Sequence, residues 1–432
     1  MMIVTLLAAA AFAIEVFPSH GHVRAIRFQE GDAVIDTAGG SFRLPGFTPL
    51  PQAAAWGGCG YEPAEQGVRR RCGGNETLVS VGGFPATAVA SYEGELFVGT
   101  FGGGLRRLNG GRVGGVPDIV TALAATRRGM LCGTEAGLYR LRGGAAERLD
   151  PPSLPEPNVS ALAAGGGSLW VGSFDRGLSA LTPSGWRHWT TADGLPSDWI
   201  DDLAWDGEKL WGATEKGVFW IVDGRAVVPQ GGVLTAPSSA LHVRGVNVYV
   251  AQPKRVVVVS PESTRTEAMP EAHPQRVWAD ESGIWVAGLD GLYRLKGHDV
   301  ARYGAIDGAL PSNWVTAVAS WAGGLLVGTY DGGLVQLDAD GSSRPVLEHA
   351  WVNLGALAAS GGRVAVGEMD GGLWLHDRGA WRRLKREDGL PSNDVTAVLF
   401  DGDKLWVGTR EGLARVELAP TEARLPSFSP MP

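Results

Sequence analysis

Two tryptophans stand where the chain leaves a turn and enters a predicted strand: Trp199 in LPSDWI and Trp314 in LPSNWV. An exposed indole can stack against a flat ring, while nearby carboxylates and amides hydrogen-bond hydroxyl groups, so the combination suits a sugar ligand. The alternative is structural, with the tryptophans covering a seam between repeats and the Asp and Asn side chains capping turns. The candidate ligand-binding residues are Trp199, Trp314, Asp198, Asp202, Asn313, Asn353, Asn393 and Asp394.

A catalytic site would need an acid, a base or a nucleophile gathered in one place. Asp201 and Asp202 are adjacent on a predicted strand, so only one of them is expected to face a channel shared with Asp394. His242 is the best-placed histidine, but nothing in the sequence pairs with it. The sequence contains no nucleophile elbow, phosphate loop or metal-ligand spacing, so we predict no catalytic residue, metal or cofactor.

These residues sit on a repeat whose clearest copy runs from Arg386 to Leu418. It reads as the turn DGLPSND followed by three short apolar-alternating runs, VTAVLF, KLWVGT and LARVEL, separated by the turns DGD and REG. This is the pattern of an antiparallel meander without a helix. A lone meander leaves one hydrophobic face in water, so copies must stack on one another.

The copies are aligned on the residue equivalent to Gly408 in WVGT, called here the reference position. A period of about 40 residues with several strands per period is typical of a β-propeller. The reference residues recur at intervals of 34 to 41 residues, at Gly99, Gly133, Gly172, Ala213, Ala251, Ala287, Gly328, Gly367 and Gly408.

A weaker copy lies at residues 23–44, and no linker interrupts the array between Gly99 and Gly408. The sequence therefore predicts an all-β fold, a β-propeller of about nine or ten four-stranded blades in one ring that spans residues 14–432. Whether the ring has nine blades or ten stays open. Either Ile14–Phe17 or the tail LAPTEARLPSF would supply the last outer strand, because an open sheet edge must be paired.

Each repeat position has an expected role. The run equivalent to VTAVLF consists of small residues, which suits the crowded strand at the propeller axis. Large aromatics such as Trp406 on the next run are expected in the core between blades. In the loop DGLPS and its equivalents, Leu195, Leu310 and Leu390 are expected to fill the blade seams, and the serines to bond the turn.

The cysteines and the N-terminus indicate an exported protein. MMIVTLLAAAAFA, residues 1–13, is expected to be a signal peptide; an uncleaved anchor or a buried strand are the alternatives. No other segment approaches the ~18 continuous apolar residues of a membrane span. Cys59 and Cys72 are expected to form a disulfide that pins a loop inserted in the first blade, and Cys132 is expected in the core. We therefore predict a periplasmic or secreted protein.

The motif DGLPSNDVTAV…LWVGT…GL resembles the two-component regulator propeller repeat, and the resemblance covers nearly the whole chain. In that family such arrays form the extracytoplasmic sensor half of membrane histidine kinases, many associated with carbohydrate sensing. There two rings precede an immunoglobulin-like domain, a membrane helix and a kinase. This chain shows none of the later parts, so it resembles a freestanding exported propeller.

Function is expected to lie in binding. The net charge is −8 and the basic residues are scattered, which disfavours a nucleic-acid partner. We expect a propeller that binds a carbohydrate or a partner protein at the mouth of its channel, where loops gather. The alternatives are a glycan-acting lyase or hydrolase with its site in the channel, and a structural interaction platform.

Overall fold

The computed structural model describes residues 13–17, 23–29, 32–37, 40–44, 55–149, 158–269 and 273–418. The predicted signal peptide and the tail after Leu418 therefore lie outside the described residues, apart from Ala13. Within them the chain forms eleven antiparallel sheets and three short 3₁₀ turns, η1 (Thr191–Asp193), η2 (Val233–Thr235) and η3 (Arg386–Asp388). The predicted all-β propeller fold is confirmed. No helix in these ranges has the length and apolar character needed to cross a membrane.

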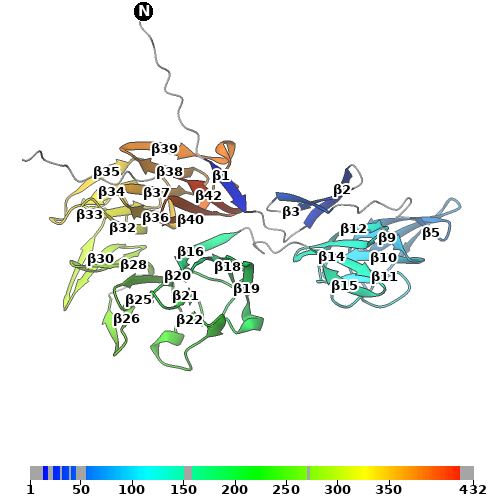
Figure 1. Cartoon of the computed structure of the whole chain (residues 1–432), viewed down its shortest axis with the longest axis horizontal. Helices are drawn as coiled ribbons and strands as arrows, with labels where there is room; N and C mark the ends of the chain where they lie inside the picture. Colours follow the sequence, from blue (N-terminus) through cyan, green and yellow to red (C-terminus); the bar gives the residue numbers. More distant parts are fainter. Residues whose placement is uncertain are drawn as a thin grey trace, which may run out of the picture. The chain divides into compact units, whose positions relative to one another are not determined.

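The chain divides into two compact units, which we describe separately. The larger unit comprises Met1–Val16 and Asn158–Pro432, and the smaller unit comprises Phe17–Pro157. In Figure 1 the larger unit runs from green to red, with the blue strand β1 beside β42.

The larger unit contains seven four-stranded sheets. The first four are β16 (Val159–Gly165), β17 (Ser168–Ser173), β18 (Leu178–Thr182), β19 (Gly185–Trp189); β20 (Asp202–Trp205), β21 (Leu210–Thr214), β22 (Gly217–Val222), β23 (Arg225–Val227); β24 (Ala240–Arg244), β25 (Asn247–Gln252), β26 (Arg255–Val259), β27 (Thr264–Ala268); and β28 (Pro274–Asp280), β29 (Gly283–Gly288), β30 (Gly291–Lys296), β31 (Asp299–Tyr303). The others are β32 (Val315–Trp321), β33 (Gly324–Thr329), β34 (Gly333–Leu337), β35 (Ser343–Leu347); β36 (Val352–Ser360), β37 (Arg363–Glu368), β38 (Gly372–Asp377), β39 (Ala380–Leu384); and β40 (Val395–Asp401), β41 (Lys404–Thr409), β42 (Gly412–Glu417) with β1 (Ile14–Phe17).

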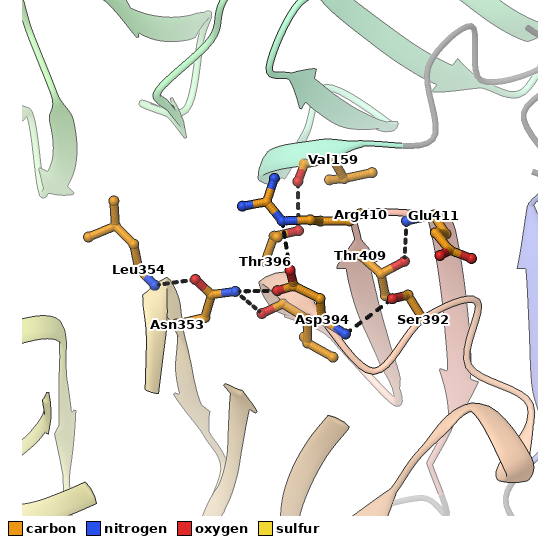
Figure 2. Close-up of polar contacts among 10 residues, drawn as sticks. Val159, Asn353, Leu354, Ser392, Asp394, Thr396, Thr409, Arg410 and Glu411 are labelled. Carbon is orange, nitrogen blue, oxygen red and sulfur yellow. Dashed lines mark hydrogen bonds and ion pairs between the residues drawn. The ribbon is translucent and has the colours of Figure 1, made fainter. Parts of the chain in front are cut away.

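The first strands of these sheets form a closed cycle. Each lies against the first strand of the next sheet, from β16 through β20, β24, β28, β32 and β36 to β40, and β40 lies against β16. The Thr396 hydroxyl donates a hydrogen bond to the Val159 carbonyl at 2.6 Å, across 237 positions of sequence (Figure 2). Seven sheets therefore complete a ring of blades, with the predicted small-residue strands at its axis.

The grouping differs from the expected single ring of nine or ten blades, because the remaining four sheets belong to the smaller unit. The reason is that successive blades meet through one repeated contact. The valine that opens an inner strand packs on the reference glycine of the preceding blade, as Val352 does on Gly328 and Val395 does on Gly367. Val159 packs on Gly408 in the same way. Because this local pattern is shared by several seams, it does not say which blade is the last.

Strand β1 completes the final sheet, which confirms one of the two closures expected from sequence. It pairs with the outer side of β42, where Glu417 N donates to Ala13 O at 3.0 Å. The Arg415 guanidinium lies 2.5 Å from the Glu15 carboxylate across the same pair. A strand from the start of the chain thus pairs the edge left open at the end of the array.

The predicted core roles are also confirmed. The aromatics of the second strands are buried, with exposed fractions of 8% or less at Phe97, Trp170, Trp211, Tyr249, Trp285 and Trp406. The loop leucines Leu195, Leu310 and Leu390 are buried as well. Ser197, Ser312 and Ser392 each accept a hydrogen bond from the backbone N–H two residues later.

The smaller unit contains four described sheets, two of four strands and two of three. They are β2 (Val23–Gln29), β3 (Asp32–Thr37), β4 (Gly40–Leu44); β5 (Ala55–Trp56), β6 (Cys59–Ala64), β7 (Gly67–Cys72), β8 (Asn75–Val79); β9 (Ala86–Tyr92), β10 (Glu95–Thr100), β11 (Leu105–Arg107); and β12 (Val120–Thr126), β13 (Gly129–Thr134), β14 (Gly137–Arg142), β15 (Ala145–Arg148).

The same inter-blade contact recurs in the smaller unit. Val120 packs on Gly99, and Val23 packs on Gly133, so the sheet that begins the unit follows the sheet that ends it. Thr121 donates to the Val23 carbonyl at 2.5 Å.

The expected disulfide between Cys59 and Cys72 is present, but its setting differs from the prediction. The two cysteines lie on the paired strands β6 and β7 of a regular four-stranded sheet, not on a loop. This sheet was not predicted from the sequence, because its strands, GVRRRC for example, are rich in charged residues and lack the apolar alternation of the other repeats. Cys132 is buried as expected, and burial raises the pKa of its thiol to about 12.

Candidate functional site at the channel mouth

Three of the predicted ligand-binding residues are engaged within their own loops. Asp198 accepts a hydrogen bond from Thr191 N at 2.7 Å, Asn313 from Ala305 N at 2.8 Å, and Asn393 from Arg386 N at 2.8 Å. The three bonds are equivalent, and each ties the start of a DGLPS-type loop to its end. These contacts match the turn-capping alternative for Asp198, Asn313 and Asn393.

Two neighbouring cavities lie on the axis of the larger unit. The channel cavity, about 150 Å³, is lined by residues from all seven inner strands. The mouth cavity, about 210 Å³, lies where those strands begin. Ser160 and Arg276 line both. The mouth cavity is also lined by Phe174, Asp201, Gln275, Asn353, Leu354 and Arg410.

Arg276 is the cation at the centre of this site. Arg276 pairs with the reference residue Ala287. At the equivalent position, opposite the reference residue, five of the other six inner strands have alanine. Its Nη1 donates to the Gln275 carbonyl at 2.9 Å and to the Ser239 carbonyl at 3.4 Å. A Cβ at Gly355 would lie 2.0 Å from Arg276 Nη2, and Gly355 has a φ of +73°. Only glycine therefore leaves room for the guanidinium at this point.

Asp201 and Asp202 face the axis at two depths. Asp202 pairs with the reference residue Ala213, where five of the other inner strands have alanine and β28 has Arg276. Only Asp202 lines the channel cavity, as expected for one of the pair, while Asp201, in the loop before β20, lines the mouth cavity.

Burial controls the charge of both carboxyl groups. It raises the pKa of Asp201 to about 6 and also raises the pKa of Asp202, while the Arg276 charge acts in the opposite direction at both. Asp202 accepts hydrogen bonds from Leu241 N at 2.8 Å and Leu203 N at 2.9 Å. Asp201 accepts one from Trp199 Nε1 at 3.1 Å.

Asn353 and Asp394 are brought together by the fold, as Figure 2 shows. Asn353 Nδ2 donates to Asp394 Oδ1 at 2.8 Å and to the Val395 carbonyl at 3.0 Å. Arg410 Nε donates to Asp394 Oδ2 at 2.6 Å, and its guanidinium lies 5.4 Å from the centre of the Phe174 ring. This network joins β36 and β40 and forms one wall of the mouth.

Sequence reasoning missed Arg410 and Phe174, although a signal was present. Both stand two residues after the reference position, as Tyr330 does. That position holds Glu135, Phe174, Glu215, Leu289, Tyr330, Met369 and Arg410 in successive clear repeats. Such variation beside an invariant turn marks a surface whose chemistry is free to differ between blades.

Three tryptophans, not two, occupy the position before an inner strand. Trp351 precedes Val352 just as Trp314 precedes Val315 and Trp199 precedes Ile200. The sequence alignment placed Asn353 there because β36 contains two additional residues, Leu354 and Gly355, within an irregular register.

Three exposed tryptophans and the half-buried Tyr330 form what we call the aromatic rim: Trp199, Trp314, Tyr330 and Trp351. The exposed fractions of the tryptophans are 49%, 39% and 51%. Trp314 stacks on Tyr330 with ring centres 4.0 Å apart, and Tyr330 lies 5.7 Å from Trp351. Trp314 Nε1 donates to Gln275 Oε1 at 3.1 Å.

Two polar atoms at the axis lack protein partners. Within the described residues, Ser160 Oγ and Trp278 Nε1 are buried without a hydrogen bond. Thr396 and Ser239, at positions equivalent to Ser160, donate to the neighbouring blade. Buried polar groups are generally paired, so these two atoms suit a water molecule or a ligand in the cavities.

His242 faces the channel cavity, as expected from sequence. Its Nε2 lies 3.3 Å from the Ala279 carbonyl, and its ring centre lies 4.2 Å from that of Trp278. Burial lowers its pKa to about 4, so the imidazole is neutral at pH 7. Across the described residues no group of three His, Cys, Asp or Glu side chains is arranged to hold a metal ion.

Comparison with known proteins supports the repeat assignment. The two component regulator propeller model matches residues 389–411, within the clearest copy. These residues are a two component regulator propeller repeat. The resemblance predicted from sequence is thereby confirmed. No curated protein matches the sequence.

Several solved structures share the fold. PorZ, a bacterial surface component of the type-IX secretion system of Porphyromonas gingivalis, is 14% identical with a TM-score of 0.58, covering 91% of this chain and 80% of PorZ. The extracellular domain of BT4673, a putative one component system from B. thetaiotaomicron, is 15% identical with a TM-score of 0.51 over 93% of this chain. The chain spans 65% of that domain. Virginiamycin B lyase from Staphylococcus aureus is 9% identical with a TM-score of 0.51, covering 61% of this chain and 96% of the lyase. At these identities the similarity concerns the fold.

Proposed function

We propose that the larger unit is an extracytoplasmic binding propeller whose ligand occupies the mouth cavity and the aromatic rim. The observation that carries the proposal is the equivalent placement of three exposed tryptophans, Trp199, Trp314 and Trp351, beside the mouth cavity, where Trp199 and Trp314 donate to the lining residues Asp201 and Gln275. A ligand that covers several indoles removes their apolar surface from water, which favours binding, and the polar groups of the cavity can hydrogen-bond the ligand.

The extracytoplasmic setting is supported by two observations. The Cys59–Cys72 disulfide is typical of an oxidising compartment. The fold neighbours include an extracellular domain and a bacterial surface component.

A carbohydrate is the ligand class that best suits the mouth. Arg276 and Arg410 are balanced by Asp201 and Asp394, so the site carries little net charge at pH 7. Guanidinium, carboxylate and amide groups in a shallow cavity beside exposed indoles favour a neutral polyhydroxylated ring over a strongly charged ligand. The second candidate ligand is a partner protein with an apolar loop that covers the rim.

The test is a glycan array with the chain from Ile14 onward, followed by titration of any glycan that binds. A Trp314→Ala, Trp351→Ala double variant should weaken the affinity at least about tenfold, which is about 1.4 kcal/mol. Phe101→Ala is the matched control, since Phe101 is 60% exposed and lies in the smaller unit. Equal affinity for the double variant and the control would refute the mouth site. If no glycan binds, and if wild type but not the double variant captures an envelope protein, the ligand at the mouth is a partner protein.

A glycan-acting lyase or hydrolase is the second candidate function. The observation that favours it is the gathering of Asp202, His242 and Arg276 along the channel cavity. Against it, both Asp202 oxygens already accept backbone hydrogen bonds, and His242 Nε2 faces a carbonyl. Turnover of an array-positive glycan that is abolished by Asp202→Asn would establish the catalytic alternative.

A further inference from the structure

A second cleft lies between two blades of the larger unit, far from the mouth. It has a volume of about 560 Å³ and lies between the sheets that begin with β28 and β32. Strand β32 runs from Val315, at the mouth end, to Trp321, which lines this cleft. Seven strand residues span about 20 Å, so the two sites are at opposite ends of the inner strands. We call this second site the seam cleft.

A small residue, Ser320, lines the seam cleft. Ser320 pairs with Leu325, three residues before the reference position Gly328. The equivalent residues of two other blades are Trp205, paired with Leu210, and Phe400, paired with Leu405. Trp205 and Phe400 pack into the hydrophobic clusters that fill their seams. Ser320 is exposed, lines the cleft and is smaller than Trp205 and Phe400, although the equivalent residues Ala164, Ala279 and Ala359 of three other blades are small as well.

The walls of the seam cleft are aromatic. Trp321 and Tyr303, both half-buried, line it together with the edge of the buried Trp285. The ring centres of Trp285 and Tyr303 lie 5.6 Å apart. Flat apolar walls of this kind bury the face of a ring-shaped ligand.

The cleft also offers hydrogen-bonding groups that the protein leaves available. The Arg294 guanidinium lies over the Trp285 ring at 5.6 Å, and no carboxylate of the described residues is within ion-pair distance of it. Asp338 accepts a bond from Gln336 Nε2 at 3.2 Å and has Arg344 at 3.7 Å from its other oxygen, so it retains accepting capacity.

The charges around the cleft disfavour a strongly charged ligand. The lining contains two arginines, Arg244 and Arg294, and three carboxylates, Asp280, Glu281 and Asp338, so both signs of charge are present. Asp280 is already occupied, because its Oδ1 accepts bonds from Ser282 N at 2.8 Å and from Trp285 Nε1 at 3.3 Å. Donors and acceptors of both signs beside aromatic walls are complementary to hydroxyl groups on an apolar ring.

We propose that the seam cleft is a second ligand site, which takes one neutral pyranose unit. The ring packs against Trp321 and Tyr303, and its hydroxyls accept from Arg294 and donate to Asp338. This site is independent of the proposed function at the mouth.

The test uses ligand-observed saturation-transfer NMR on the full chain with the methyl glycosides of glucose, galactose, mannose and N-acetylglucosamine. Three variants are compared with wild type. Ser320→Phe fills the cleft with the side chain that Phe400 provides in its own blade. Arg294→Met keeps the packing of the stem on Trp285 but removes the donors. Trp351→Ala is the control at the mouth.

At least one glycoside should bind wild type and Trp351→Ala equally, lose binding at least tenfold with Ser320→Phe, and weaken severalfold with Arg294→Met. Arg294→Met carries the test if Ser320→Phe does not fold. The proposal is overturned if no glycoside binds wild type, or if binding is lost only in Trp351→Ala, which would assign the sugar to the mouth. Binding of N-acetyltyrosinamide at the cleft with no glycoside bound would also overturn it, in favour of a peptide side chain.

Discussion

The larger and smaller units use one inter-blade contact but differ in completeness. Every sheet of the larger unit has four strands, and the last sheet meets the first through Val159 and Gly408. In the smaller unit two of the four described sheets have three described strands, and beside the three-residue β11 a bridge joins Arg106 to Arg112 while Val113 N donates to Leu105 O at 2.8 Å. The repeated contact thus sets which blades are neighbours, while β1, a strand from the start of the chain, completes the last sheet of the larger unit.

The two units are also stabilised differently. The larger unit buries seven seams in a closed cycle, whereas the smaller unit has fewer seams and contains the Cys59–Cys72 disulfide. Small domains with limited buried area commonly depend on such a covalent link. We therefore expect a substitution in one unit to change the stability of that unit and not of the other.

The largest effect is expected from filling the inter-blade contact. A Cβ at Gly408 would lie 2.5 Å from Val159 Cγ1, and a Cβ at Gly133 would lie 2.5 Å from Val23 Cγ1. Gly408→Val should therefore destabilise the larger unit, and Gly133→Val the smaller unit, by about 3 kcal/mol or more. Hydrogen exchange read by mass spectrometry should show faster exchange in the affected unit.

Gly111→Val is the matched control, because a Cβ there meets nothing within 4 Å. If Gly408→Val accelerated exchange in both units equally, the division into separately stabilised parts would be wrong.

The disulfide is expected to matter only to the smaller unit. Cys59 and Cys72 are 13 positions apart, and a loop of this size stabilises a fold by about 2 to 3 kcal/mol. A Cys59→Ser, Cys72→Ser double variant should lose that amount in the smaller unit and leave the larger unit unchanged. Unit-resolved urea titration followed by hydrogen exchange measures both. Unfolding of the larger unit at lower urea in the variant would contradict this prediction.

His242 should make the larger unit less stable in acid. Its folded pKa of about 4 lies below the usual 6.5, so the unfolded chain binds the proton more readily and stability falls as the pH drops from about 6.5 to 4. His242→Gln should remove this loss, raising stability relative to wild type by up to about 2 kcal/mol at pH 4 and little at pH 7. Thermal unfolding across this pH range is the measurement. A constant difference at every pH would show that His242 titrates normally.

Asp201 should act in the opposite direction with a smaller effect. Its folded pKa of about 6 lies above the usual 3.8, so stability falls as the pH rises from about 4 to 6. Asp201→Asn should therefore gain stability over wild type with rising pH, by about 1 kcal/mol at pH 7 after solvent screening. The same unfolding series tests it, with Asp198→Asn as the control on the loop. A gain that appears only at low pH would reverse the assigned sign.

Much of the fold was predictable from sequence, and so was part of the site. Strand order within a blade, the buried aromatics such as Trp406 and the seam leucines follow from period and from turn chemistry, whereas Ile14–Phe17 was one of two closing strands that the sequence allowed. The mouth residues Trp199 and Trp314 were found because they precede a recognisable strand. Trp351 was missed because two extra residues in β36 shifted the alignment, and Arg410 because its partner Asp394 lies on another element.

The sequence by itself determined the all-β repeat, the identity of each blade position and the turns that join them. These depend on residues within about 40 positions of one another, where alternation and glycine placement act directly on the backbone. The tertiary structure alone decided that seven sheets close into a cycle, that Gly355 makes room for Arg276, and that a cleft lined by Ser320 lies between two blades. Each of those outcomes is a contact between blades, and similar seam chemistry recurs at several blade boundaries, so only the packed structure selects among the possible neighbours.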